Sequence, residues 1–281
     1  MKKKIITLIG AVALIAVLSA GCGKTGGPED GVKSQEKAFS KDNPITLKVL
    51  ADQVPHAELL NFVKPKLASL GVNLDITILQ NDHGNEDTDN GEFDVNFFQH
   101  QPYLDSIKKE KGYDLANAGN IHVEPIGFYS AKYKTREELP ENAVVGIPND
   151  VTNEYRALKI LEQNGFIKLK ADLPEHAATV KDIAEYTRKI ELKEIDSAQL
   201  IRLKEDFDGY ITNTNKILEA GIDANSALFR EGKDSPYANI LVTKSSRVNE
   251  PAIVALKQAL TTPEVRKFIE DKYKGAVIPA F

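Results

Sequence analysis

Side chains able to bind a small molecule gather in four short segments, three of which lie at the end of an expected strand and the fourth where the chain would cross back between lobes. The first segment is FDVNFFQHQPYLD (93–105), in which Phe98, His100 and Tyr103 follow an apolar run. Aromatic rings and an imidazole combine contact area with hydrogen-bonding tips, which suits an apolar group with a polar end. A packed core strand with a satisfied histidine is the alternative, and spacing alone favours it.

The second segment, IPNDVTNEYRAL (147–158), places Asn153 and Arg156 just after a strand-to-helix turn. Backbone N–H groups at a helix start and a guanidinium fork together can receive a carboxylate. In the alternative, Asp150 or Thr152 only caps the helix and Arg156 is a surface charge.

The last two segments carry asparagines. GYITNTNKIL (209–218) places Asn213 after an apolar strand, and DSPYANI (234–240) places Asn239 in an extended stretch. Amide side chains could hold the ammonium and carboxylate of an amino acid. Asparagine is also common in turns, so turn chemistry is the alternative.

Motifs for catalysis are absent from the sequence. It contains no G-x-S-x-G elbow, H-E-x-x-H helix, phosphate-binding Walker loop or dinucleotide-binding glycine pattern. His56 with Glu58, or His83 with Glu86, could in principle bind a metal, but the histidines lack paired ligand spacing. We therefore expect no enzymatic activity, no metal and no cofactor.

Strand-like and helix-like segments alternate from residue 45 onward. Strands are expected at 45–51, 72–79, 93–98, 143–148, 189–195, 207–212 and 239–244. Helices are expected at 56–71, 102–112, 152–165, 197–206, 215–221, 250–262 and 263–275. This order predicts an α/β fold with mostly parallel sheets.

Two long extended stretches, near 122–134 and 237–244, favour two lobes joined by crossing strands. We assign 45–130 and 239–281 to lobe I and 131–238 to lobe II. In such folds a ligand binds at the carboxyl ends of strands, in the crevice between the lobes.

The N-terminus has the layout of an export signal. Three lysines precede a short apolar run, and small residues precede the sole cysteine, Cys22, as in a bacterial lipobox. Residues 1–21 are thus expected to be a lipoprotein signal peptide, with acylation, as by palmitate, at Cys22. An uncleaved membrane anchor or a chance cysteine is the alternative.

Residues 22–44 are rich in glycine, lysine, serine and acids, which is typical of a flexible tether. We expect a protein lipid-anchored on the outer side of the cytoplasmic membrane. The net charge of −5 and the pI near 5.7 argue against a nucleic-acid partner.

Several motifs together carry a family likeness. They are PHAELL, GEFDVNFFQHQPYLD, IPNDVTNEYRAL, EIDSAQL, DSPYANILV and YKGAVIPAF. On these motifs the chain resembles the methionine-binding lipoproteins of methionine ABC importers, over essentially the whole body after the tether. The resemblance implies a monomeric, two-lobed periplasmic-binding-protein-like fold with a hinge of two crossing strands. Its implied partners are L-methionine and a complex of ABC permease and ATPase.

The resemblance also implies roles for individual residues. Phe98, His100 and Tyr103 would form the wall around the thioether side chain. Arg156 would hold the α-carboxylate, with Asn153 beside it. The remaining two residues, which would bind the amino-acid head, are Asn213 and Asn239.

Three positions depart from the family pattern. Asn81, in the segment 79–92, stands where a tyrosine is usual, and Tyr155 stands where a glycine is usual. Lys216 and Ile217 replace an expected tyrosine and alanine. These changes affect the side-chain pocket, so a methionine-containing dipeptide, another small amino-acid-type ligand and a surface lipoprotein with a degenerate cleft stay open as alternatives.

Overall fold

The computed structural model describes residues 39–80, 83–232 and 235–281. The expected signal peptide, Cys22 and Asn81 lie outside this part of the chain. Phe39 is only 4% exposed and packs in the core, and Ser40 pairs with Asn43 in a short turn. The folded part therefore includes residues 39–44, which the sequence assigned to the tether. Among the described residues, no helix has the length and apolar character needed to cross a membrane.

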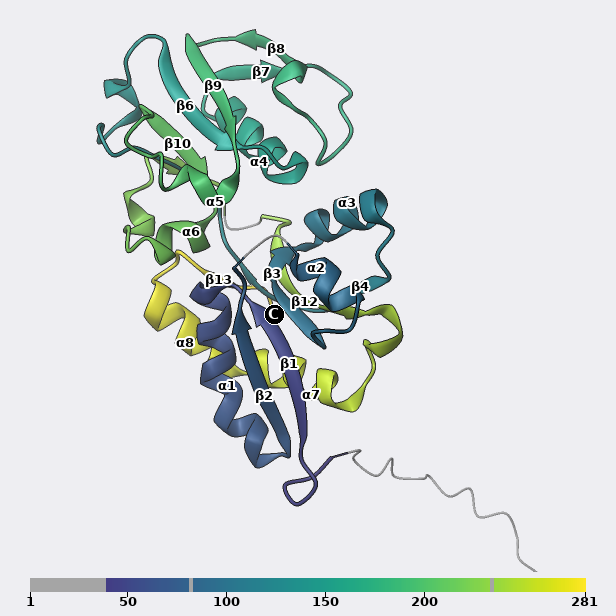
Figure 1. Ribbon diagram of the computed structural model, residues 1–281. Helices are drawn as coiled ribbons and strands as arrows, with labels where there is room; N and C mark the ends of the chain where they lie inside the picture. Colours follow the sequence, from purple (N-terminus) through teal and green to yellow (C-terminus); the bar gives the residue numbers. More distant parts are fainter. Residues whose placement is uncertain (1–38, 81–82, 233–234) are drawn as a thin grey trace, which may run out of the picture. The chain divides into compact units, whose positions relative to one another are not determined.

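The first sheet has six strands in the order β13-β4-β12-β3-β1-β2 (Figure 1). Its strands are β1 (Ile45–Ala51), β2 (Val72–Ile78), β3 (Val95–His100), β4 (Leu115–Val123), β12 (Ala238–Lys244) and β13 (Ile278–Pro279). Its helices are α1 (Glu58–Ser69), α2 (Gly84–Asp89), α3 (Gln101–Lys111), α7 (Pro251–Leu260) and α8 (Pro263–Tyr273). Strand β1 runs parallel to β2 and β3, whereas β12 runs antiparallel to β3 and β4.

Helices cover both faces of this sheet because successive side chains of a strand point to opposite sides. In β12, Leu241 packs in the core shared with α1, α7 and α8. Its neighbours Ile240 and Val242 pack instead with Leu104 of α3. All three strand residues are fully buried, which explains why the segment reads as a continuous apolar run.

The second sheet has five strands in the order β11-β5-β10-β6-β9. Its strands are β5 (Gly127–Tyr129), β6 (Ala143–Pro148), β9 (Ile190–Ile195), β10 (Gly209–Thr212) and β11 (Phe229–Arg230). Its helices are α4 (Val151–Gln163), α5 (Ser197–Leu200) and α6 (Thr214–Glu219). A separate hairpin pairs β7 (Ile167–Leu169) with β8 (Ile183–Tyr186). The two sheets have the α/β character expected from the sequence, but the expectation of mostly parallel sheets is wrong: each sheet is mixed, because β4, β12 and β13 in the first and β5 and β11 in the second pair antiparallel.

Two connecting segments join the sheets. The first is residues 124–126, between β4 and β5, and the second is residues 231–237, between β11 and β12, of which 233 and 234 are not described. Strand β5 pairs with β10, so residues 127–129 hydrogen-bond in the second sheet. The lobe boundary expected at residue 130 is therefore too late for residues 127–129, which belong to the second sheet.

Replacing Gly209, at the start of β10, would test the packing of the second sheet. A Cβ atom on Gly209 would lie 2.2 Å from Cζ of Phe128, whose ring stacks on Phe229 at 4.7 Å. We expect Gly209→Ala to reduce the free energy of unfolding by about 1–3 kcal/mol, because the buried ring has little space to move.

In thermal unfolding followed by circular dichroism, this loss of stability should lower the Tm by roughly several degrees. Gly232→Ala is the matched control, since its Cβ would meet nothing within 4 Å. Equal Tm values for the two variants would contradict the packing described here.

Candidate ligand-binding site

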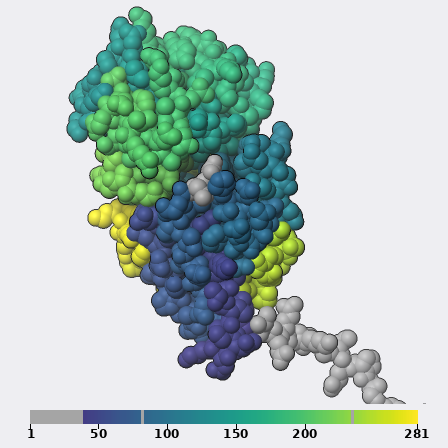
Figure 2. All heavy atoms as spheres, viewed as in Figure 1, coloured from purple at the N-terminus to yellow at the C-terminus, as the bar shows by residue number. Residues whose placement is uncertain are grey.

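A cavity of about 600 Å³ is lined by residues of the first sheet and by residues of the loops and helices that follow strands of the second. This volume lies within the range that small-molecule sites occupy. In Figure 2 the residues of the second sheet, in teal and green, gather apart from the purple and blue residues that begin the first. Many lining residues directly follow a strand, as Asp52 follows β1, Asp196 follows β9 and Asn213 follows β10. The cavity thus occupies the carboxyl ends of parallel strands, as the sequence predicted.

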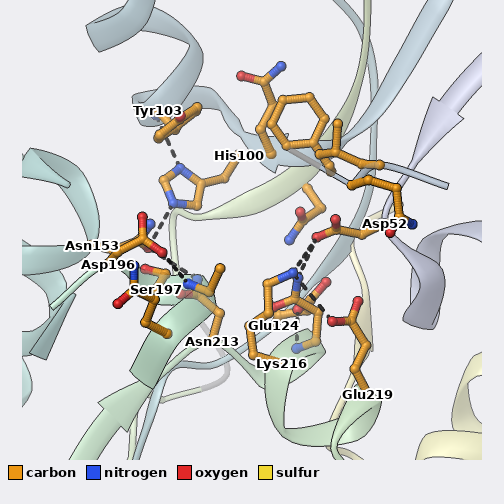
Figure 3. A pocket seen from close by; sticks show the side chains of 18 of the residues that line it. Asp52, His100, Tyr103, Glu124, Asn153, Asp196, Ser197, Asn213, Lys216 and Glu219 are labelled. Atoms are coloured by element: carbon orange, nitrogen blue, oxygen red, sulfur yellow. Dashed lines mark hydrogen bonds and ion pairs between the residues drawn. The ribbon is translucent and has the colours of Figure 1, made fainter. Parts of the chain in front are cut away.

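One end of the cavity is built from an imidazole and two amides (Figure 3). Oδ1 of Asn153 lies 3.2 Å from Nε2 of His100 and accepts a hydrogen bond of 3.1 Å from Nδ2 of Asn213. Nδ2 of Asn153 donates to both carboxylate oxygens of Asp150 at 3.0 Å, which fixes the orientation of the amide. We call this group, His100, Asn153 and Asn213, the amide end.

The protonation of His100 follows from its neighbours. Its Nδ1 accepts the backbone N–H of Tyr103 at 3.2 Å, so the proton is on Nε2 and is donated to Asn153. Burial, and then the charge of Arg156, lowers the pKa of His100 to about 3. The imidazole is therefore neutral at physiological pH and joins the two sheets through a neutral hydrogen bond.

The opposite end of the cavity is acidic. Glu124 accepts the backbone N–H of Asn215 at 2.8 Å, and Asp52 accepts the side chain of Asn215 at 2.6 Å. Nζ of Lys216 lies 3.4 Å from carboxylate oxygens of both Asp52 and Glu219. Two carboxyl groups thus flank the lysine, Glu124 is a third carboxyl group at this end, and burial raises the pKa of both Glu124 and Glu219. This acidic end, Asp52, Glu124 and Glu219 with Lys216, has negative charge to spare for a cationic group.

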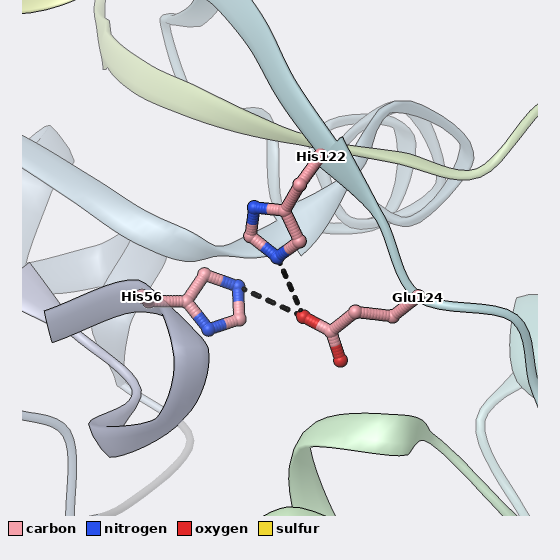
Figure 4. A group of neighbouring side chains, drawn as sticks. All are labelled: His56, His122 and Glu124. Atoms are coloured by element: carbon pink, nitrogen blue, oxygen red, sulfur yellow. Dashed lines mark hydrogen bonds and ion pairs between the residues drawn. The ribbon is translucent and has the colours of Figure 1, made fainter. Parts of the chain in front are cut away.

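Two buried histidines hold Glu124 in place (Figure 4). Nε2 of His122 lies 2.7 Å from Oε1 of Glu124, and Nε2 of His56 lies 3.5 Å from the same oxygen. His56 also lies 3.0 Å from Oδ1 of Asn239. Burial lowers the pKa of both histidines, in the case of His122 to about 3, so both imidazoles are neutral hydrogen-bond donors.

This cluster, whose three side chains each offer a ligand atom within 4.8 Å of the others, fits a metal poorly. In the described part of the chain, Nδ1 of both His56 and His122 is buried without a hydrogen-bond partner. Histidines that bind a metal through Nε2 almost always donate the other ring N–H to an acceptor. A metal here would leave two buried donors unpaired, whereas the hydrogen bonds to Glu124 already account for the cluster.

The other metal candidates from the sequence lie apart. Glu58 forms an ion pair with Lys272 at 2.9 Å and accepts a hydrogen bond from Tyr273. Its carboxylate is therefore bound to α8 and does not form a metal site with His56. His83 and Glu86 form an exposed pair at 3.2 Å.

The structure brings together most of the residues singled out from the sequence. Six of them line the cavity, namely Phe98, His100, Tyr103, Asn153, Asn213 and Asn239. Leu79 and Ala198 add apolar surface to the rings of Phe98 and Tyr103. Tyr155, which departs from the family pattern, lines a separate cavity of about 290 Å³ and so leaves the larger one open.

Arg156 differs from the expectation. Among the residues the structure describes, it is not part of the lining of the larger cavity, and only 1% of its surface is exposed. Its Nε and Nη2 atoms donate to the carboxylate of Glu231 at 2.9 and 2.6 Å. The fork that the sequence assigned to a ligand carboxylate is thus engaged by a carboxylate of the chain itself.

The acidic end was missed in the sequence. Asp52 directly follows a strand that was expected, and Lys216 was noted only as a departure from the family pattern. The position of Asp52 was therefore a usable signal. Glu124 follows β4, most of which was not expected as a strand; it lies in the extended stretch expected near 122–134, but nothing there marked it as a ligand-site residue.

Comparisons with known proteins agree with this geometry. The NlpA lipoprotein family model matches residues 47–281. A protein named "Probable D-methionine-binding lipoprotein MetQ" from Vibrio cholerae is 35% identical to this chain, covering 98% of it and 97% of the relative.

Solved structures are similar over most of the chain. A nutrient-binding protein from Burkholderia cenocepacia, bound to methionine, has a TM-score of 0.80 at 38% identity, covering 84% of this chain and 100% of that one. A periplasmic substrate-binding protein of an ABC transporter from Coxiella burnetii has a TM-score of 0.79 at 33% identity, covering 83% and 100%. This chain therefore belongs to the NlpA lipoprotein family.

Proposed function

We propose that this chain is the substrate-binding lipoprotein of an ABC importer and that it binds L-methionine in the cavity between its sheets. The observation that carries this proposal is the polarity of the cavity, which has hydrogen-bond donors at one end and spare carboxylates at the other. An amino acid is a zwitterion and matches both ends at once. The names of the relatives support the same ligand.

The carboxylate of the ligand is assigned to the amide end. The side chains of Asn213 and His100 both donate there; His100 ends β3 of the first sheet, and Asn213 directly follows β10 of the second. Hydrogen bonds to a charged acceptor are stronger than those between neutral groups. A bound carboxylate would therefore favour the arrangement in which the two sheets are close together.

The ammonium is assigned to the acidic end, beside Glu124. This carboxylate is 3% exposed and is already oriented by His122 and the backbone of Asn215. A buried, oriented carboxylate gains more from a cation than an exposed one does, because water screens the charges less. The thioether chain is left to the apolar surface of Phe98 and Tyr103.

The remaining parts of the proposal concern delivery. The two sheets with their helices would act as lobes that close over the ligand and present it to a permease driven by an ATPase. The chain would be a monomer without enzymatic activity, held by a lipid on Cys22 at the outer side of the cytoplasmic membrane.

A methionine-containing dipeptide is the second candidate ligand. The cavity volume of about 600 Å³ lies in the middle of the range for drug-sized molecules, so it leaves space beyond one amino acid. Calorimetric titration of ligand-stripped protein with L-methionine and with its dipeptides decides between them. Flat titrations with all of these ligands would overturn the proposal.

Replacing the carboxylate of Glu124 tests the ammonium assignment. In Glu124→Gln, we expect the Kd for L-methionine to rise roughly ten- to hundredfold, because a charge-assisted contact is lost. The Kd for 4-(methylthio)butanoate, which is methionine without its amino group, should change little. Calorimetry measures both constants.

Glu162→Gln is the control, since this carboxylate bonds to Lys159 on the surface of α4 and not to the cavity. An equal loss of affinity for both ligands in Glu124→Gln would show that the carboxylate does not recognise the amino group.

The pH dependence of binding tests the same assignment from another side. Burial raises the pKa of Glu124 above its ordinary value of 4.5, so this group takes up a proton earlier than an exposed glutamate as the pH falls. Because the protonated form is neutral, we expect methionine to bind more weakly as the pH is lowered from about 7.5 to about 5.

Calorimetric titrations at several pH values check this expectation. In Glu124→Gln, the Kd for methionine should not depend on pH in this way. A similar weakening in that variant would assign the effect to another group.

A further inference from the structure

Arg156 lies where the two connecting segments meet. Besides its two bonds to Glu231, its Nη2 donates to the backbone carbonyl of Glu124 at 3.0 Å. Its guanidinium also lies 4.1 Å from the centre of the Tyr237 ring. Glu124 belongs to the first connecting segment, and Glu231 and Tyr237 belong to the second. One side chain of α4 therefore contacts both passages between the sheets.

Glu231 also contacts both connecting segments. Its Oε2 accepts the backbone N–H of Ile126 at 3.1 Å and the hydroxyl of Ser235 at 3.2 Å. Together with the bidentate pair to Arg156, this carboxylate joins the first segment, the second segment and α4. Its side chain is 13% exposed and, within the described part of the chain, is not among the residues lining the larger cavity. Direct contact with the ligand is therefore not its role.

The link to the ligand site runs through Asn153. Nη1 of Arg156 donates to Oδ1 of Asn153 at 3.2 Å. The same oxygen is the one that His100 and Asn213 approach at the amide end. Because Glu231 binds the guanidinium through two N–H groups, it fixes the direction in which Nη1 points.

We propose that Glu231 is a positioning residue for ligand recognition, which holds Arg156 so that the guanidinium orients Asn153 at the amide end. This inference rests on the proposed function, since it concerns the end of the cavity assigned to the ligand carboxylate.

The experiment compares two ligands that differ only at the carboxylate. L-methionine and L-methioninol share the ammonium and the thioether, but methioninol carries a hydroxymethyl group instead of the carboxylate. In Glu231→Gln, we expect the Kd for L-methionine to rise about tenfold and the Kd for methioninol to rise less than about threefold. A purely structural role for Glu231 would weaken both ligands by the same factor and would overturn the inference.

A double variant tests whether Glu231 acts through the arginine. If it does, Glu231→Gln should add nothing to the Kd for L-methionine once Arg156→Gln is present. Independent, multiplying effects of the two changes would contradict the inference. Glu175→Gln is the matched control, because Glu175 lines the same small cavity as Glu231 but lies beside His176 instead of Arg156.

Removing one partner of a buried ion pair can prevent folding. Circular dichroism therefore precedes each titration. If Glu231→Gln is unfolded, Glu231→Asp replaces it, because the shorter side chain keeps the charge but cannot reach both N–H groups. The same change in the ratio of the two Kd values is expected, and an unchanged ratio would overturn the inference.

The wild-type titration separates this inference from the proposed function. If the wild-type protein binds neither ligand, the proposed function fails. If it binds L-methionine and the variant keeps the wild-type ratio, only the role of Glu231 is wrong.

Discussion

A buried guanidinium constrains the centre of this protein. Arg156 is almost without solvent contact, and a charge in that position must be neutralised and fully hydrogen-bonded. Glu231 supplies the opposite charge, the carbonyl of Glu124 accepts one more N–H, and Asn153 accepts another. These partners come from α4 and from both connecting segments. The requirement to satisfy one cation therefore fixes the path of the chain between its sheets and sets the amide that faces the cavity.

Much of the site could be predicted because it depends on a simple geometric rule. The carboxyl ends of parallel strands meet at one edge of a sheet, and polar residues just beyond those ends face a common space. His100 and Asn213 were singled out on that basis, and both line the cavity. The apolar runs of β3 and β10 marked these strand ends in the sequence.

Other features gave no local signal. Strand β4 has the sequence LANAGNIHV, whose small and polar residues do not form the apolar pattern of a strand. In the structure it pairs with both β12 and β13. Its neighbour Glu124 was missed for the same reason. The partner of Arg156 lies 75 residues away, and only tertiary contacts bring the two charges together. Sequence reasoning recognised the arginine as a receptor for a carboxylate, but local spacing could not reveal the internal carboxylate of Glu231 that binds it.

The position of β12 has a consequence for the order in which the chain can fold as it is synthesised. Every strand of the second sheet lies between residues 127 and 230, so this sheet can be complete before the C-terminal part exists. The first sheet, by contrast, needs β12 between β3 and β4, and β12 ends only at Lys244. In a nascent chain that stops before this point, β3 lacks one neighbouring strand and β4 lacks both, and such unpaired strand edges are prone to aggregate. The N-terminal half of the protein is therefore the last to become stable.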